Sequence, residues 1–140
     1  MIEFGPGIFG VGTAASHYFN KKPADVTPLE AAFFGSILPS PRRRYIQYCR
    51  GELSRSWERY VRRILRRMHQ RGKVTDVDYE AAKAQKIVFA RDFEQLSESD
   101  CKARIKEGNK AWTRAYLKRL KQAVLRAAPH QLRMYLKKKN

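Results

Sequence analysis

The chain has 140 residues, of which 43% are hydrophobic and 11% aromatic, enough for one globular domain and too many for a fully disordered protein. Thirty Lys and Arg residues against 13 Asp and Glu residues give a net charge of +17, which indicates an anionic partner: nucleic acid, a phospholipid surface or a phosphorylated substrate. No apolar run approaches the roughly 18 residues of a transmembrane helix, and the first residues lack the pattern of a signal peptide.

The positive charge is concentrated in two segments. Residues 42–73 carry a net charge of +10 and residues 102–140 carry +12, whereas residues 1–41 and 74–101 are net negative. Basic segments of this kind either bind an anionic partner or form a solvent-exposed face, and the sequence is compatible with both.

Two cysteines, Cys49 and Cys101, are too few for a disulfide framework and lack CxxC spacing. The sequence leaves open whether they pair. The histidines His17, His69 and His130 lie far apart without the spacing of metal ligands, so no metal site is indicated in this chain.

The expected elements in the first third are a turn and two helices. The glycine-rich run 5–12 indicates a tight turn, and residues 13–19 a short helix. Thr27 and Glu30 have the spacing of a capping box, which predicts a helix that ends before Pro39.

The clearest helix covers residues 57–68. Its apolar residues form one stripe at helical spacing, namely Trp57, Tyr60, Val61, Ile64, Leu65 and Met68. Arginines fill the rest of this helix, and Gly72 favours an end just after it. A short helix capped by Thr75 and ending near Ala84 follows, then a long basic helix over about 102–127. No strand pattern competes, so we expect an all-α chain.

A series of ordered segments resembles glycosyltransferase family 51, the peptidoglycan glycosyltransferases that polymerise lipid II. These segments are residues 4–11, 14–19, 27–32, 37–41, 64–68 and 72–82. The resemblance implies that residues 1–86 form the C-terminal lobe of a lysozyme-like helical domain. Residues 87–140 are then an acidic linker and a basic helical tail.

The family-motif residues within these segments are Gly5, Gly7, Gly10, Ala14, Ala15, Tyr18, Phe19, Thr27 and Glu30. We expect structural roles for them. The glycines turn the chain and permit close packing instead of cradling a phosphate, and Glu30 completes a helix cap.

The two glutamate motifs of the family are absent from this sequence. The family has Glu-x-Tyr-Leu-Asn directly before the glycine-rich run. It has Glu-Asp-x-x-Phe-x-x-His, which supplies the catalytic glutamate, further upstream. Glu3 lies too close to Gly5 to be a motif glutamate. We therefore expect no catalytic residue in this chain, and interpret it as the C-terminal part of such an enzyme, inactive alone.

The resemblance implies displacement of a lipid diphosphate from the anomeric carbon of a growing glycan, which requires positive charge at the leaving group. Arg59, Arg62 and Arg63 are the candidates for this pyrophosphate-binding role. The family places an arginine four residues before its Val-Leu pair. Tyr60 occupies that position here, and Arg59 is rotated from it by about 100° on a helix. We expect no cofactor in this chain, although some complete enzymes use a divalent metal.

The implied partners are a lipid-linked disaccharide, an anionic membrane surface and the N-terminal portion of the domain. The implied location is the bacterial cell envelope, at the periplasmic face of the inner membrane. Trp112 and Tyr116 lie on the apolar face of the basic tail helix, which suits docking on the domain or on a membrane. Two alternatives remain: a small basic nucleic-acid-binding protein and a non-catalytic membrane-surface scaffold. Nucleic acid is less favoured, because no recognised binding motif is present.

Overall fold

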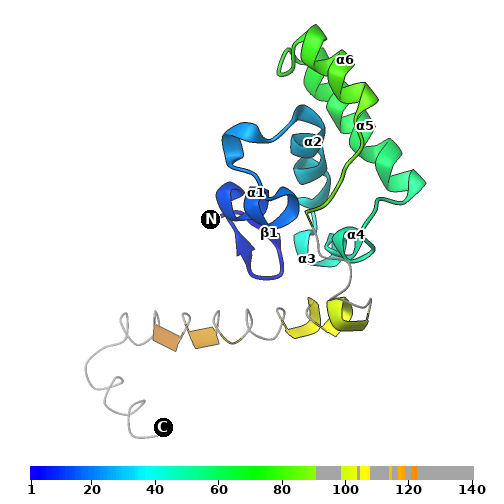
Figure 1. Cartoon of the computed structure of the whole chain (residues 1–140). Coiled ribbons are helices and arrows are strands. Elements are labelled where there is room, and N and C mark those ends of the chain that lie inside the picture. Colours follow the sequence, from blue (N-terminus) through cyan, green and yellow to red (C-terminus); the bar gives the residue numbers. More distant parts are fainter. Residues whose placement is uncertain (91–98, 104, 108–113, 115–116, 119–120, 123–140) are drawn as a thin grey trace, which may run out of the picture.

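The computed structural model describes residues 1–90, 99–103, 105–107, 114, 117–118 and 121–122 (Figure 1). Its elements are β1 (Glu3–Gly5), β2 (Ile8–Phe9), α1 (Val11–Phe19), the 3-10 helix η1 (Pro23–Asp25), α2 (Pro28–Ile37), α3 (Pro41–Arg44), α4 (Ile46–Cys49), α5 (Arg55–Gln70) and α6 (Asp76–Ala84). This confirms the predicted all-α class, apart from one short hairpin, and is consistent with a lysozyme-like domain. Within the described residues, no helix has the length and apolar character needed to cross a bilayer.

Strands β1 and β2 form an antiparallel hairpin in which Glu3 faces Phe9 and Gly5 faces Ile8. Gly7 in the turn has a φ of 75°, a conformation that favours glycine. The predicted turn is present, and two short strands that the sequence pattern did not indicate flank it. The strands have three and two residues, too few for an alternation of apolar and polar side chains to reveal them.

The side chain of Tyr18 in α1 lies at the centre of the core and is fully buried. Its hydroxyl donates a hydrogen bond of 2.7 Å to the carbonyl oxygen of Phe4 in β1. Aromatic rings surround it, contributed by Phe19, Phe33, Phe34, Tyr45, Tyr48 and Phe89. Burial, and then the neighbouring Tyr45 and Tyr48, raise the pKa of Tyr18 above its ordinary value, so the hydroxyl stays protonated and donates.

Helix α2 begins with the predicted capping box. The Thr27 hydroxyl accepts from the Glu30 backbone N–H at 3.3 Å, and the Glu30 carboxylate accepts from the Thr27 backbone N–H at 2.9 Å. Lys21 donates to the same carboxylate at 2.8 Å. Glu30 is thus buried with its oxygens satisfied, which confirms its interpretation as a capping residue.

Two short helices that the sequence did not reveal, α3 and α4, connect α2 to α5. Pro41 occupies the first position of α3, where its missing N–H costs nothing. The Arg42 guanidinium donates to the Glu3 carboxylate at 2.8 Å, and both side chains are largely buried. This ion pair connects α3 to the hairpin.

Helix α5 packs against α2 through one side of the predicted apolar stripe. Val61 and Leu65 are fully buried, whereas the other stripe residues are half-buried at its edges. The Trp57 indole N–H donates at 3.1 Å to the Ser36 hydroxyl of α2. Gly35 of α2 lies opposite Ile64, and a Cβ added at this glycine would be 3.6 Å from the Ile64 side chain, an ordinary van der Waals contact.

The chain returns to the core after α6. Phe89 is buried against Tyr18, Tyr48 and the α2 aromatics, and the Ala90 N–H donates to the Tyr18 carbonyl at 2.9 Å. Cys49 and Cys101 form a disulfide with a Cα–Cα distance of 5.7 Å, which answers the question that the sequence left open. The core therefore includes residues beyond position 86.

The described residues of the predicted basic helix at 102–127 are helical, as are residues 99–101 just before it (Figure 1). Its predicted aromatic face, with Trp112 and Tyr116, lies outside the described residues.

Replacing Tyr18 with Phe is expected to lower the free energy of unfolding by about 1–3 kcal/mol, because the buried Phe4 carbonyl loses its hydrogen-bond donor. Chemical denaturation followed by circular dichroism measures this change. Tyr60→Phe is the matched control, since Tyr60 is only half-buried, and it should change stability by less than about 0.5 kcal/mol. Equal losses in both variants would contradict the role given to the Tyr18 hydroxyl.

Removing the disulfide in the double variant C49A/C101A is expected to lower stability by about 4 kcal/mol, the loop-closure value for its sequence separation of 52 residues. Thermal or chemical denaturation with and without a reducing agent checks this expectation. The reductant should destabilise the natural sequence and leave the double variant unchanged. If the reducing agent does not change the stability of the natural sequence, the disulfide does not stabilise the fold.

Candidate functional site

Four of the exposed arginines of α5 lie on its outer face, namely Arg55, Arg59, Arg63 and Arg66, and are here called the arginine row. At 3.6 residues per turn these positions fall within an arc of about 80° and extend over about 16 Å along the helix. The row faces away from the core because Val61 and Leu65 occupy the opposite side of the same helix.

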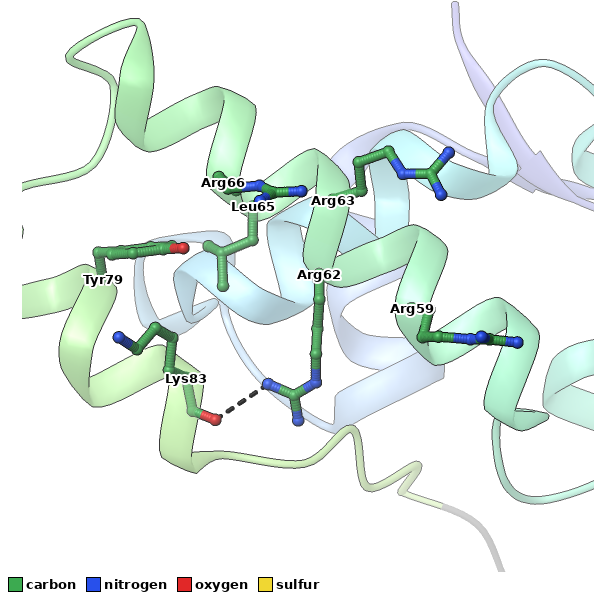
Figure 2. Close-up of a pocket in the computed structure, with 7 residues that line it drawn as sticks. All are labelled: Arg59, Arg62, Arg63, Leu65, Arg66, Tyr79 and Lys83. Carbon is green, nitrogen blue, oxygen red and sulfur yellow. Dashed lines mark hydrogen bonds between the residues drawn. The ribbon is translucent and has the colours of Figure 1, made fainter.

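A pocket of about 400 Å³ lies between α5 and α6 (Figure 2). It is lined by Arg59, Arg62, Arg63, Leu65, Arg66, Tyr79 and Lys83. A neighbouring hollow of about 550 Å³ is lined by Arg55, Glu58, Arg59 and Arg62. The three arginines predicted for pyrophosphate binding therefore line one pocket. Two further cationic residues line it, Arg66 of the same helix and Lys83, which comes from a helix that the sequence did not connect to them.

Arg62 differs from the neighbouring arginines because its guanidinium is hydrogen-bonded to the end of α6 and to Glu58. It donates at 2.9 Å to the carbonyl oxygens of Lys83 and Gln85, and at 2.9 Å to the Glu58 carboxylate. In Figure 2 it points to the end of α6, while Arg59 and Arg63 extend away from it. Arg62 thus binds the carbonyl groups at the C-terminal end of α6, which favours a structural role over ligand binding.

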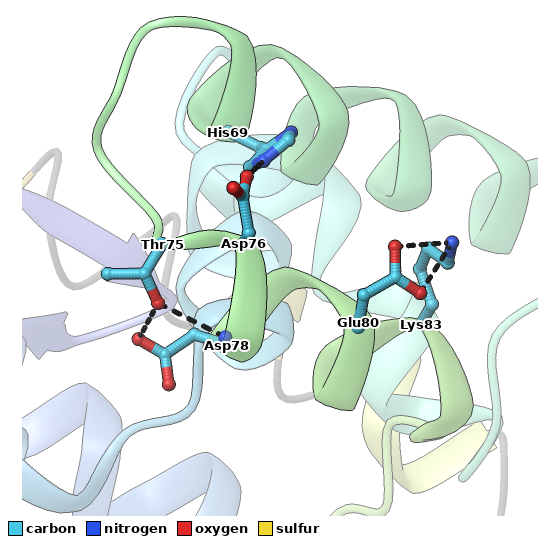
Figure 3. Close-up of polar contacts among 6 residues, drawn as sticks. All are labelled: His69, Thr75, Asp76, Asp78, Glu80 and Lys83. Carbon is cyan, nitrogen blue, oxygen red and sulfur yellow. Dashed lines mark hydrogen bonds and ion pairs between the residues drawn. The ribbon is translucent and has the colours of Figure 1, made fainter.

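Helix α6 is held in place by a cap and by contacts at its start (Figure 3). The Thr75 hydroxyl accepts from the Asp78 backbone N–H at 3.1 Å, and the Asp76 carboxylate lies 2.6 Å from the His69 imidazole. The His69 ring stacks on Tyr79 with centroids 4.2 Å apart. These contacts fix the wall of the pocket that α6 provides.

The pocket's lysine is also positioned by its own helix. Lys83 lies 2.8 Å from the Glu80 carboxylate (Figure 3). Its ammonium is 5.4 Å from the centre of the Tyr79 ring. The hydrogen bond to Glu80 raises the pKa of Lys83 above its ordinary value, so the amine carries its charge at neutral pH. Glu80 offsets part of that charge.

The family-motif glycines lie in the hairpin region and line neither pocket. A Cβ on Gly5 would lie 2.9 Å from the Tyr18 hydroxyl oxygen, so this position requires glycine for close packing. Gly10 has a φ of 83° and precedes α1, whose Ala14 and Ala15 are fully buried. Within the described part of the chain, no group of three or more His, Cys, Asp or Glu side chains is placed to hold a metal ion.

The N-terminal half of the chain matches a known protein family. Residues 1–69 match the family model described as transglycosylase. Together with the relatives described below, this match supports a transglycosylase domain in this part of the chain, here called the transglycosylase segment. The transglycosylase segment ends at the last turn of α5, so it includes the arginine row, whereas α6, Phe89 and Cys101 lie beyond the matched residues.

The chain is also similar to individual transglycosylases. Proteins called "biosynthetic peptidoglycan transglycosylase" from Yersinia pestis (strain Pestoides F) and Yersinia pseudotuberculosis serotype O:1b are each 41% identical over 77 residues. That alignment covers 54% of this chain and 30% of each relative, so the chain matches about a third of the length of these transglycosylases.

Replacing Arg62 with Met is expected to lower the free energy of unfolding by about 1–2 kcal/mol, because the last carbonyl groups of α6 lose a charged donor. Arg63→Met is the matched control, because Arg63 is exposed, and it should cost less than about 0.5 kcal/mol. Chemical denaturation measures both changes, and hydrogen exchange of the α6 amides should accelerate only in R62M. If the two variants behave alike, Arg62 does not hold α6.

Proposed function

We propose that this chain is a portion of a peptidoglycan glycosyltransferase and that Arg59 and Arg63 contact the diphosphate of its lipid-linked disaccharide substrate. The observation that carries this proposal is the position of two exposed arginines of the transglycosylase segment, one helical turn apart, at a pocket that α6 completes from outside the matched residues. The relatives called "biosynthetic peptidoglycan transglycosylase" supply the substrate class.

Arg59 and Arg63 are suited to a diphosphate for physical reasons. Neither guanidinium makes an ion pair with a described residue, and both extend away from Arg62 in Figure 2. A guanidinium remains charged at all relevant pH values and presents paired N–H donors that match two phosphate oxygens. In glycosyl transfer, the new glycosidic bond forms while the bond from the anomeric carbon to the diphosphate oxygen breaks, so negative charge grows on the departing diphosphate and fixed cations stabilise it.

This chain contributes cations to the reaction and no proton acceptor. Neither glutamate motif of the family occurs in it, so the proposal assigns the general base to residues outside this sequence. A general base typically accelerates a reaction about 10²–10⁴-fold, so the chain alone is expected to bind a diphosphate without polymerising glycan.

The rest of the domain would contact the N-terminal face of this chain. Met1, Ile2, Phe9 and Val11 form an exposed apolar surface around the hairpin and the start of α1. Since monomeric proteins rarely leave several large apolar side chains exposed together, this surface suits further parts of a transglycosylase domain.

We further propose that the chain works at the periplasmic face of the inner membrane, in the cell envelope that its relatives imply. The Cys49–Cys101 disulfide supports this location, because disulfides persist in the oxidising periplasm and are rare in the cytosol.

Binding of geranyl diphosphate, a water-soluble isoprenyl diphosphate, tests the proposal by calorimetry at low salt. The variant R59Q/R63Q is expected to bind at least about tenfold more weakly, because each charge-assisted contact contributes about 1.5–3 kcal/mol when formed to a charged group. The matched control R43Q/R50Q removes the same charge from exposed arginines outside α5 and should bind normally. Geraniol should not bind. If both variants bind equally, Arg59 and Arg63 are not the diphosphate site.

A further inference from the structure

The arginine row is longer than one diphosphate can occupy. The row extends over about 16 Å of helix. A diphosphate has two phosphorus atoms joined by a single oxygen, so it reaches two neighbouring guanidinium groups. Arg55 lies one turn before Arg59 and outside the pocket between α5 and α6. The part of the row around Arg55 is therefore available for another anion.

The positive charge of the row is not neutralised by the described acidic residues around it. Glu58 is paired with Arg62, and Glu80 with Lys83. Glu52 and the exposed Asp76 lie before and after α5, and Asp76 contacts His69. The four arginines of the row make no ion pair with any of these described carboxylates, so their field extends into solvent.

We propose that the arginine row binds a surface of anionic phospholipid headgroups, with α5 lying parallel to the membrane plane. Cations along one side of a straight helix match a planar array of phosphates, because all of them reach the same plane together. The large apolar side chains that are exposed in the described part of the chain belong to other elements, so this contact is electrostatic and does not require insertion into the hydrocarbon region.

The described aromatic side chains near the row favour lipid over nucleic acid. Trp57 and Tyr60 pack edge to face, with Arg44 over both rings, and Tyr79 is stacked on His69. These rings are engaged within the protein, whereas binding of single-stranded nucleic acid typically uses free aromatic rings on which bases stack.

The inference deepens the proposed function and rests on it for the presence of a membrane, since a lipid-linked substrate holds its diphosphate at headgroup level. A membrane contact along α5 would bring Arg59 and Arg63 to that level. The binding itself depends only on charge, so it can be tested separately from diphosphate binding.

The test is cosedimentation of the full chain with vesicles of phosphatidylglycerol and phosphatidylcholine at low and high salt. Each arginine near an anionic surface changes partitioning by about fivefold, so R55Q should bind about fivefold and R55Q/R66Q about 25-fold more weakly at low salt. The controls R50Q and R43Q/R50Q remove the same charges away from α5 and leave the basic tail unchanged. High salt should reduce the differences between these variants.

Three results would overturn the inference. The first is an effect of the α5 variants no larger than that of their controls. The second is equal binding to pure phosphatidylcholine vesicles. The third is a duplex DNA or RNA that binds more tightly than the vesicles at equal salt and loses affinity in R55Q/R66Q.

Geranyl diphosphate binding separates this inference from the proposed function. R55Q should bind this diphosphate as the natural chain does, because Arg55 lies outside the pocket. Vesicle binding that depends on the row, without diphosphate binding by the natural chain, would support the membrane surface and reject the diphosphate site. Diphosphate binding by the natural chain, without vesicle binding that depends on the row, would reject the membrane surface and keep the diphosphate site.

Discussion

Tyr18 joins three parts of the molecule that are distant in sequence. Its hydroxyl bonds to the hairpin through Phe4, its ring packs on the aromatics of α2, and its backbone carbonyl accepts from Ala90. A buried hydroxyl and a buried carbonyl each require a hydrogen-bond partner. These bonds therefore determine where the hairpin and the segment after α6 lie. Gly5 is part of the same constraint, since a side chain there would meet the Tyr18 oxygen.

The site on α5 is a consequence of how α5 is buried. Val61 and Leu65 face α2, and helical periodicity then places the arginine row on the opposite side. Arg62 lies at the edge of that face, where it reaches the end of α6. Helix α5 therefore supplies core contacts, the attachment of α6 and a cationic surface. Which of these roles a residue has depends on its position around the helix axis.

Elements with local signals were predictable from sequence. The cap at Thr27, the apolar stripe of α5 and the cap at Thr75 depend on residues within a few positions of each other. The hairpin and the helices α3 and α4 are too short for periodicity to show. Long-range contacts were not predictable, because nothing local in Arg62 or Phe89 indicates the partner each one meets.

In the predicted site, too, the local features could be predicted from sequence and the long-range contacts could not. The spacing of the α5 arginines predicts a common face, but only the packed structure shows that Arg62 is already occupied and that Lys83 and Tyr79 complete the pocket. The spacing of Arg55, Arg59 and Arg66 was the signal for the longer row, because these positions differ by at most about 40° around the helix.

The disulfide has a topological consequence for this site. Cys49 and Cys101 enclose α5 and α6, with every residue of the pocket, in a single covalent ring. A peptide bond broken anywhere inside that ring opens it without releasing a piece, because both ends of the break remain attached through the sulfur atoms. In an envelope that contains proteases, a chain nicked between α5 and α6 would therefore keep its cationic helix attached to the body of the protein.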